Sequence, residues 1–289
     1  MAALDHQPAP PNSLAAIQNC LQAGAAFIEI DVTALADKDY LLVHDAELQV
    51  ETSGQGPVAE STLEQVRSLA IRHREAITNH PVALLSQVVR AFQDFPGQTR
   101  LQIDYKNVIP FPNDEPLYRL VDLIQPLSER VIVSSGADWQ LRRLRKIAPW
   151  LRLGFDIMWY IDWQQDNPPR DPRQYPKTRG AYGYFDDHIL ASQRHWSIPQ
   201  YLADRCESLV ALVPDISVFY LEHPLIAQSL RDGFNWAEAL HAYGILLDAW
   251  TMDVTNPIVV ESAPLLLKAG VDLFTTNTPK ALATLLNIP

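Results

Sequence analysis

The stretch FIEIDV at residues 27–32 places two carboxylates two positions apart inside an otherwise apolar segment. Side chains of a β-strand alternate between its two faces, so Glu29 and Asp31 are expected to point the same way. Two like charges held this close repel each other unless something positive lies between them. The pattern therefore predicts a strand whose two acidic side chains share a cation. The alternative is a pair of solvated carboxylates that meet surface Lys or Arg side chains.

Strand-like and helical runs alternate along the rest of the chain. A first helix is predicted at SLAAIQNCLQAG, with Ser13 as its N-cap and Gly24 at its end. Alternation at this spacing predicts a parallel sheet with helical crossovers. The expected strands are AFIEIDV, RLQIDYK, RVIVSSG, LRLGFD, LVALVPDISV, GILLDAWT and VDLFTTN.

Seven strand-like runs are one fewer than the eight strands of a (β/α)8 barrel. An open doubly wound sheet is the competing architecture, but no Gly-rich phosphate loop follows any of the runs. We therefore predict an α/β fold, a (β/α)8 TIM-type barrel, as a single domain over residues 1–289. Its first strand is expected to be missing or degenerate within MAALDH. After the EIDV strand, TALADKDYLLVHD predicts a short antiparallel excursion that returns His44 to the level of Asp31.

Composition and charge narrow the class of protein. The net charge of −11 argues against a nucleic-acid-binding or anionic-membrane surface. Two cysteines, Cys20 and Cys206, are too few for a disulfide framework or a Cys-rich zinc site, which favours a cytoplasmic location. No apolar run reaches the length of a transmembrane segment, and the N-terminal residues do not have the pattern of a signal peptide.

The run LQIDYK offers a third carboxylate. Gln102, Asp104 and Lys106 share one face of that expected strand. An all-oxygen site of Glu29, Asp31 and Asp104 suits Mg²⁺ or Ca²⁺ as the cofactor. Lys106 is then placed to hold an anionic substrate oxygen, most plausibly that of a phosphate. The alternative for Asp104 and Lys106 is a simple internal ion pair, which is compatible with the first interpretation.

Two further residues are candidates for the site. His44 is either a structural hydrogen-bonding residue or, because of its expected return toward the carboxylates, a general acid or base near neutral pH. Trp250, near the C-terminal end of the strand in LDAWT, is the aromatic residue that we expect to face the barrel mouth and contact substrate.

Several motifs follow one another in a family-specific order. PPNSLAAI is similar to a P-E-N-T-L-A-A pattern, IEIDV and LLVHD follow it, and LQIDYK stands where the family has E-I-K. TSGQGPVAESTLEQVRSL, VIVSSGADWQLRRLRKIAPWLRLG, AWTMD and GVDLFTTNTP complete the series. In this succession the chain resembles the glycerophosphodiester phosphodiesterases, relatives of the phosphoinositide phospholipases C that are built on a (β/α)8 barrel.

The resemblance implies a function in lipid metabolism. It implies a phosphoric diester hydrolase with Glu29, Asp31 and Asp104 as metal ligands, Lys106 as a phosphate contact and His44 as one catalytic histidine. The substrate would be a small-molecule glycerophosphodiester, from which hydrolysis releases glycerol phosphate. A bound cation would spread the phosphodiester charge, and a proton donor would let the alcohol leave.

The chain also departs from the family pattern. The family's His-Arg-Gly motif on the first strand, which supplies a second histidine and an arginine, has no counterpart here, and His6 is the nearest candidate replacement. Loss of one proton-transfer group lowers a rate by about two to four orders of magnitude. Either the sequence begins downstream of its natural start, which the coincidence of missing strand and missing motif favours, or the protein is a slow or inactive relative.

Two alternatives to the enzyme stay open. One is a non-catalytic barrel that binds metal and a phosphoryl ligand without turnover. The other is a metal-dependent sugar isomerase on the same barrel, which leaves the excursion that carries His44 unexplained.

Overall fold

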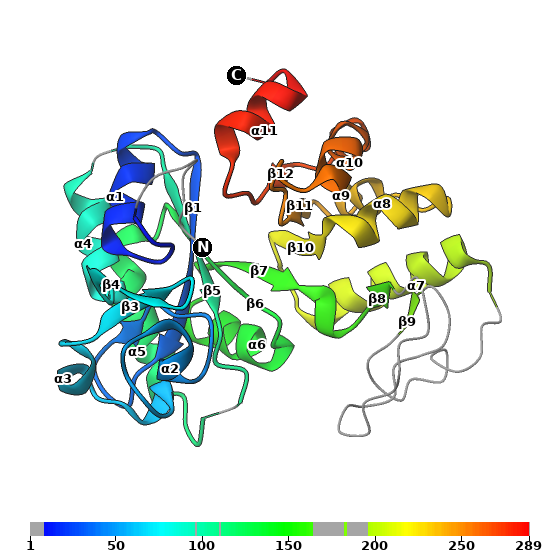
Figure 1. Cartoon of the computed structure of the whole chain (residues 1–289). Coiled ribbons are helices and arrows are strands. Elements are labelled where there is room, and N and C mark those ends of the chain that lie inside the picture. The colour runs from blue at the N-terminus through cyan, green and yellow to red at the C-terminus, as the bar shows by residue number, and fades with distance from the viewer. Residues whose placement is uncertain (1–8, 96, 110, 164–181, 184–195, 289) are drawn as a thin grey trace, which may run out of the picture. The chain divides into compact units, whose positions relative to one another are not determined.

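Figure 1 shows the computed structural model of the chain, in which residues 9–95, 97–109, 111–163, 182–183 and 196–288 are described. Contacts between residues divide the chain into two compact units, Met1–Leu153 and Gly154–Pro289. Each unit contains parallel strands that alternate with helices, as the sequence pattern predicts.

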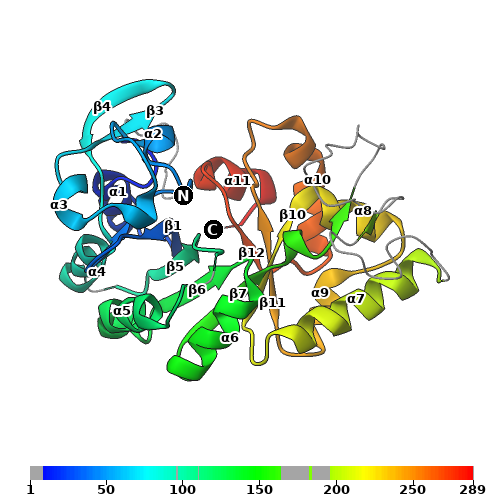
Figure 2. The ribbon, with the colours of Figure 1, turned by 90° about the horizontal axis from the view of Figure 1, so that it is seen from below.

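The sheet strands of the first unit are β1 (Phe27–Ala34), β2 (Tyr40–Leu41), β5 (Arg100–Tyr105) and β6 (Val131–Ser135). Strand β1 lies between β5 and β2, parallel to β5 and antiparallel to β2, and β5 pairs in parallel with β6 (Figure 2). The parallel register places Glu29 opposite Gln102 and Asp31 opposite Asp104. The two strands predicted at FIEIDV and LQIDYK are therefore confirmed, and they are neighbours.

Helices alternate with the sheet strands of the first unit along the chain, beginning with α1. Helix α1 begins where the sequence predicts, because the Oγ of Ser13 accepts a hydrogen bond from the backbone N–H of Ala16 at 3.1 Å. Helix α1 packs against α4, α4 against α5, and α5 against α6, so each buries one apolar face. The bounds are α1 (Leu14–Gln22), α4 (Leu85–Asp94), α5 (Glu115–Ile124), the short helix η2 (Gln125–Leu127) and α6 (Asp138–Ile147).

The antiparallel excursion after β1 is also confirmed, and it is larger than expected. It continues from β2 through α2 (Leu48–Glu51), η1 (Val58–Glu60), α3 (Leu63–Val66), β3 (Ala70–His73) and β4 (Ala76–Pro81) before α4 begins. Strands β3 and β4 pair antiparallel. The excursion is held by its own apolar cluster, which comprises Leu35, Leu41, Val43, Leu48, Val58, Val66, Ile71 and Val82.

The second unit contains the parallel strands β7 (Arg152–Asp156), β10 (Val218–Glu222), β11 (Leu246–Trp250) and β12 (Leu273–Phe274), in that order. A short antiparallel pair, β8 (Asp162–Trp163) and β9 (Tyr182–Gly183), lies outside this sheet. The remaining elements are η3 (Ile157–Trp159), α7 (Ile198–Leu212), α8 (His223–Arg231), α9 (Trp236–His241), α10 (Pro257–Lys268) and α11 (Pro279–Leu286).

The strand predicted at LVALVPDISV is wrong except at its last residue, Val218. Residues 209–212 are the last turn of α7, and the strand begins only at Val218. The apolar run continues the helical spacing of Leu202, Cys206 and Leu209, all of which are buried on one face of α7. A short apolar run does not by itself distinguish a strand from a buried helical segment.

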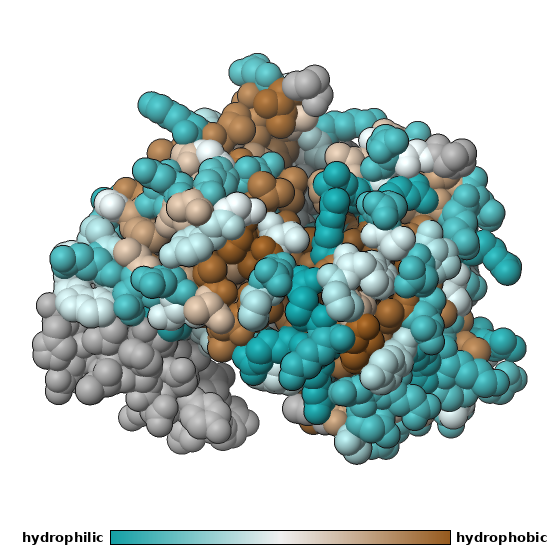
Figure 3. Space-filling model, turned by 180° about the vertical axis from the view of Figure 1, so that it is seen from behind, coloured by the Kyte–Doolittle hydropathy of each residue, from teal (hydrophilic) through white to brown (hydrophobic). Residues whose placement is uncertain are grey.

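The described residues on one face of the molecule are mixed in polarity. On the face drawn in Figure 3, hydrophilic side chains are interspersed with apolar ones. Among the described residues, no helix combines the length and the apolar composition that a bilayer crossing requires.

Candidate active site

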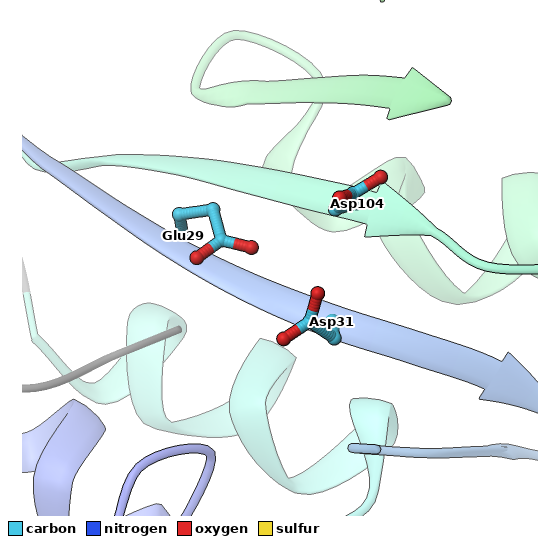
Figure 4. A group of neighbouring side chains, drawn as sticks. All are labelled: Glu29, Asp31 and Asp104. Atoms are coloured by element: carbon cyan, nitrogen blue, oxygen red, sulfur yellow. The ribbon is translucent and has the colours of Figure 1, made fainter. Parts of the chain in front are cut away.

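Three carboxylates converge on neighbouring strands of the first unit. Glu29 and Asp31 lie two apart on β1, and Asp104 lies opposite Asp31 on β5, so all three project from one face of the sheet. Figure 4 shows their carboxylates turned toward one another. One oxygen from each residue lies within 4.8 Å of the others. The structure therefore brings together the three residues that the sequence predicts as metal ligands.

Lys106 lies just beyond β5 and contacts two of these carboxylates. Its Nζ lies 2.6 Å from Oδ2 of Asp104 and 3.0 Å from Oδ1 of Asp31. Burial alone would lower the pKa of Lys106, but the charges and hydrogen bonds of Asp104 and Asp31 outweigh burial and raise it. The predicted ion pair is present and includes both aspartates. The ammonium group therefore stays charged and compensates the negative cluster.

The two aspartates differ in how their ionisation is balanced. Burial, the largest effect, raises the pKa of Asp104, and the charge of Asp31 acts in the same direction, while the charge of Lys106 opposes both without cancelling them. For Asp31, burial is opposed by nearby positive charge, including Lys106, and by the hydrogen bonds from Asn12 and Lys106, which together lower its pKa. Asp31 is thus the carboxylate held most firmly in its charged form.

Asn12 is a member of the site to which the sequence analysis gave no role. Its Nδ2 donates to Oδ2 of Asp31 at 3.0 Å, and its Oδ1 accepts from the backbone N–H of Asp31 at 3.4 Å. Asn12 is buried and has a φ of 58°, a left-handed conformation that Asn adopts more readily than most residues. Two signals were available, the match of Asn12 to the Asn of the P-E-N-T-L-A-A pattern and its place immediately before the Ser13 cap of α1.

His44 lies on the return segment of the excursion. Strands β1 and β2 pair Thr33 with Leu41, and Oγ1 of Thr33 donates to the carbonyl oxygen of Val43 at 3.2 Å, so the segment continues alongside β1. The predicted antiparallel return is therefore confirmed at Tyr40–Leu41, and the place of His44 at the level of Asp31 stays a prediction. The imidazole of His44 is 52% exposed, and Nδ1 lies 3.7 Å from Oδ2 of Asp45.

Glu51, a second residue that the sequence analysis did not single out, contacts the His44 segment. Its Oε2 accepts hydrogen bonds from the backbone N–H groups of His44 at 2.5 Å and of Asp45 at 3.1 Å. Burial, together with the charge of Asp31, raises the pKa of Glu51 despite these two hydrogen bonds.

Two other candidates lie elsewhere. Trp250 ends β11 in the second unit and is partly buried, so its position at the end of a strand is as predicted, while its contact with substrate stays a prediction. His6 lies outside the described residues.

The donor set of the three carboxylates fits a hard divalent cation. Carboxylate oxygens are the preferred protein ligands of Ca²⁺ and Mg²⁺, and no nitrogen or sulfur ligand is among the three. A cation there would lie beside the ammonium of Lys106, so two positive groups would face one small space. Such a pair is suited to a doubly substituted phosphate, whose negative charge is spread over two non-bridging oxygens.

Comparison with known proteins identifies related sequences. A sequence profile of the Glycerophosphoryl diester phosphodiesterase family matches residues 6–170, which are 165 of the 289 residues. A glycerophosphodiester phosphodiesterase from Caldanaerobacter subterraneus subsp. tengcongensis is 29% identical over 154 residues. That match covers 52% of this chain and 62% of the relative, so it spans less than two thirds of the relative's length.

Solved structures show the same fold at low sequence identity. A glycerophosphodiester phosphodiesterase from Parabacteroides distasonis superposes with a TM-score of 0.67 at 16% identity, covering 99% of this chain and 94% of that one. A phosphodiesterase from Oleispira antarctica, solved with the product sn-glycerol-3-phosphate, gives a TM-score of 0.60 at 15% identity, covering 96% and 92%. The α/β fold is therefore the barrel type predicted from the strand-helix alternation.

Proposed function

This chain belongs to the glycerophosphoryl diester phosphodiesterase family, and we propose that it hydrolyses glycerophosphodiesters with the help of one divalent cation. The observation that carries the proposal is the convergence of Glu29, Asp31 and Asp104 beside Lys106. The proposed cation is Mg²⁺ or Ca²⁺, because all three ligands offer oxygen. The proposed substrates are glycerophosphodiesters or lysophospholipids, from which hydrolysis releases an alcohol.

Each residue has a separate part in the proposed reaction. A bound cation supplies positive charge that weakens the repulsion between the phosphodiester anion and an attacking water. Lys106 donates a hydrogen bond from Nζ to a non-bridging phosphoryl oxygen and holds the substrate in register. His44 exchanges a proton with the attacking water or with the leaving alcohol, since an alkoxide leaves poorly without one. Asn12 keeps the carboxylate of Asp31 oriented. Trp250 is proposed to contact the substrate's alcohol.

A second candidate function rests on a specific feature of the sequence. The 289 residues contain no His-Arg-Gly triplet, which in the family supplies the second proton-transfer histidine. A barrel with the cation site and Lys106 but without that pair of groups would bind metal and a phosphoryl ligand and turn over slowly or not at all. The expected place of the first strand, MAALDH, lies outside the described residues.

We place the proposed reaction in a reducing compartment. Cys20 and Cys206 are buried thiols, which is the usual state of cysteines in cytoplasmic proteins. A small-molecule phosphodiester is the expected partner of the site, and the net charge of −11 disfavours an anionic polymer.

One experiment distinguishes hydrolysis from binding without turnover. Glycerophosphocholine is incubated with the protein in Ca²⁺, in Mg²⁺ or in EDTA, and release of glycerol phosphate or choline is measured. The enzyme is supported by release that requires metal and is lost in Asp104→Asn. Binding of Ca²⁺ and glycerol phosphate in calorimetry without any release would support the non-catalytic barrel. Conversion of free sugars without phosphate release would instead revive the isomerase.

A further inference from the structure

Among the described residues, few contacts hold the imidazole of His44 in place. It is half-exposed, and Asp45, at 3.7 Å from Nδ1, is its charged neighbour. A proton-transfer group nevertheless needs a defined position, because a displacement of about 1 Å can cost about 10²-fold in rate. The orientation of His44 must therefore come largely from its backbone.

The backbone of His44 is held by one carboxylate. Oε2 of Glu51 accepts from two successive amide groups, those of His44 and Asp45, at 2.5 Å and 3.1 Å. Hydrogen bonds to an ionised acceptor are stronger than those between neutral groups. Two of them on consecutive amides fix the path of the chain at the residue that carries the imidazole.

Glu51 itself is carried by a well-anchored turn. It ends α2, whose first residue Leu48 is buried and donates a hydrogen bond from its backbone N–H to the carbonyl oxygen of Gly56 at 2.9 Å. Thr52, directly after Glu51, is fully buried and donates from both N–H and Oγ1 to the carbonyl oxygen of Leu48 at 2.8 Å and 2.7 Å. The carboxylate is therefore presented from a fixed backbone, a requirement for holding another segment in place.

The segment that Glu51 holds is hydrogen-bonded to β1, because Oγ1 of Thr33 donates to the carbonyl oxygen of Val43, directly before His44, at 3.2 Å. The charge of Asp31 also contributes to raising the pKa of Glu51. Glu51 therefore fixes a segment that contacts the strand carrying Glu29 and Asp31.

We propose that Glu51 is a positioning residue that holds His44 at the site through the backbone N–H groups of His44 and Asp45. This inference rests on the proposed hydrolysis for its catalytic meaning, although the anchoring can be measured without it. Glu51 touches neither substrate nor metal in this role. Its effect is on the step that uses His44.

The test compares Glu51→Ala with Glu51→Gln. The amide oxygen of Gln can still accept both hydrogen bonds, whereas Ala accepts none, so the conservative variant should rescue the position. Glu60→Ala is the matched control, because Glu60 belongs to the same excursion and is exposed. For each protein, kcat and KM for glycerophosphocholine, the Ca²⁺ affinity, and the hydrogen-exchange rates of the His44 and Asp45 amides are measured.

We expect Glu51→Ala to lower kcat by about 10- to 100-fold while KM and Ca²⁺ affinity change by less than about 3-fold. Exchange of both amides should become at least about 10-fold faster, and Glu51→Gln and Glu60→Ala should stay within about 3-fold of the parent in every measurement. A Glu51→Ala protein with parental kcat and parental exchange would overturn the inference, as would equal losses in the Gln variant.

Failure of the proposed function has a different signature. If the parent protein does not hydrolyse the diester under any metal condition, the catalytic assignment fails while the exchange rates still decide the anchoring. If the parent is active and only the exchange rates respond to Glu51→Ala, the carboxylate is structural and the positioning role is wrong.

Discussion

Two buried aspartates, one in each unit, have pKa values that are shifted in opposite directions. Asp31 in the first unit is 2% exposed and Asp248 in the second is 3% exposed. The pKa of Asp31 is nevertheless lowered, whereas burial raises the pKa of Asp248 to about 8. Equal burial therefore does not decide the charge state of a carboxylate. The partners that surround it do.

The partners of the two carboxylates differ in kind. Asp31 forms an ion pair with the ammonium of Lys106 and accepts a hydrogen bond from the side-chain amide of Asn12. Oδ2 of Asp248 accepts a hydrogen bond from the hydroxyl of Thr275 at 3.1 Å. Its Oδ1 has no hydrogen-bond partner among the described residues. The charge of Asp156 on β7 raises the pKa of Asp248 further. The surroundings of Asp31 therefore favour a charged carboxylate that can bind a cation. The carboxyl group of Asp248 is instead mostly protonated near neutral pH.

The largest expected difference between the two aspartates is in catalysis. Asp31→Asn removes a proposed metal ligand, and we expect hydrolysis to fall by about 10²- to 10⁴-fold because several kcal/mol of charge stabilisation are lost. Asp248→Asn should leave kcat/KM within about 3-fold. Steady-state assays of both variants at saturating Ca²⁺ or Mg²⁺ check this prediction. Equal losses in the two would show that the acid of the second unit also acts in the reaction.

The next largest effect is expected on stability when Lys106, whose charge compensates Asp31 and Asp104, is replaced. Lys106→Met leaves Asp31 and Asp104 without their shared cation, and removal of one partner from a buried pair costs about 3 to 5 kcal/mol. We expect this loss in the free energy of unfolding in EDTA and a partial recovery with Ca²⁺, which replaces the missing positive charge. Urea denaturation measures both. The exposed Lys146→Met in α6 serves as the control, with an expected change below about 0.5 kcal/mol.

The sequence predicted the site where local pattern and function coincide. The period of two in FIEIDV and in LQIDYK determines which side chains share a face, so Glu29, Asp31, Asp104 and Lys106 could be grouped before the fold was known. The same periodicity located the parallel strands. The polar turn before β2 indicated the antiparallel return at Tyr40–Leu41.

Other features of the site depend on contacts that the sequence pattern does not contain. Asn12 and Glu51 reach their partners across 19 and 7 residues of chain through side-chain geometry, and neither shows a periodic signal. The start of β10 was misplaced because LVAL suits a buried helical face as well as a strand. Asp248 lies in a run with the pattern of an ordinary strand, and its raised pKa depends on its burial and on the charge of Asp156.

The pH dependence of stability should separate the two aspartates. The folded-state pKa of Asp248, about 8, exceeds an unfolded value of about 3.9, so the folded protein binds more protons between these values. Stability contributed by this group is therefore full below about pH 4 and falls as the pH rises toward 8. Asp248→Asn keeps an acceptor for Thr275 and loses this dependence.

We expect Asp248→Asn to be more stable than the parent at pH 8 by about 2 to 4 kcal/mol, with little difference at pH 4. Urea denaturation at several pH values between 4 and 8 measures the difference. A constant difference at every pH would mean that Asp248 does not change its protonation over this range.

The smallest expected effect is that of replacing Asn12, the uncharged hydrogen-bond donor to Asp31. Asn12→Gly removes both side-chain hydrogen bonds to Asp31 while keeping a residue that accepts a φ of 58°, and we expect a cost of about 1 to 2 kcal/mol in the free energy of unfolding. Asn12→Ala should cost about 1 kcal/mol more, because an alanine in the left-handed region is strained. If Gly and Ala cost the same, the backbone at residue 12 relaxes and the φ of Asn12 has no energetic role. If Asn12→Gly costs nothing, Lys106 alone orients Asp31, and the two aspartates differ only by that single ammonium group.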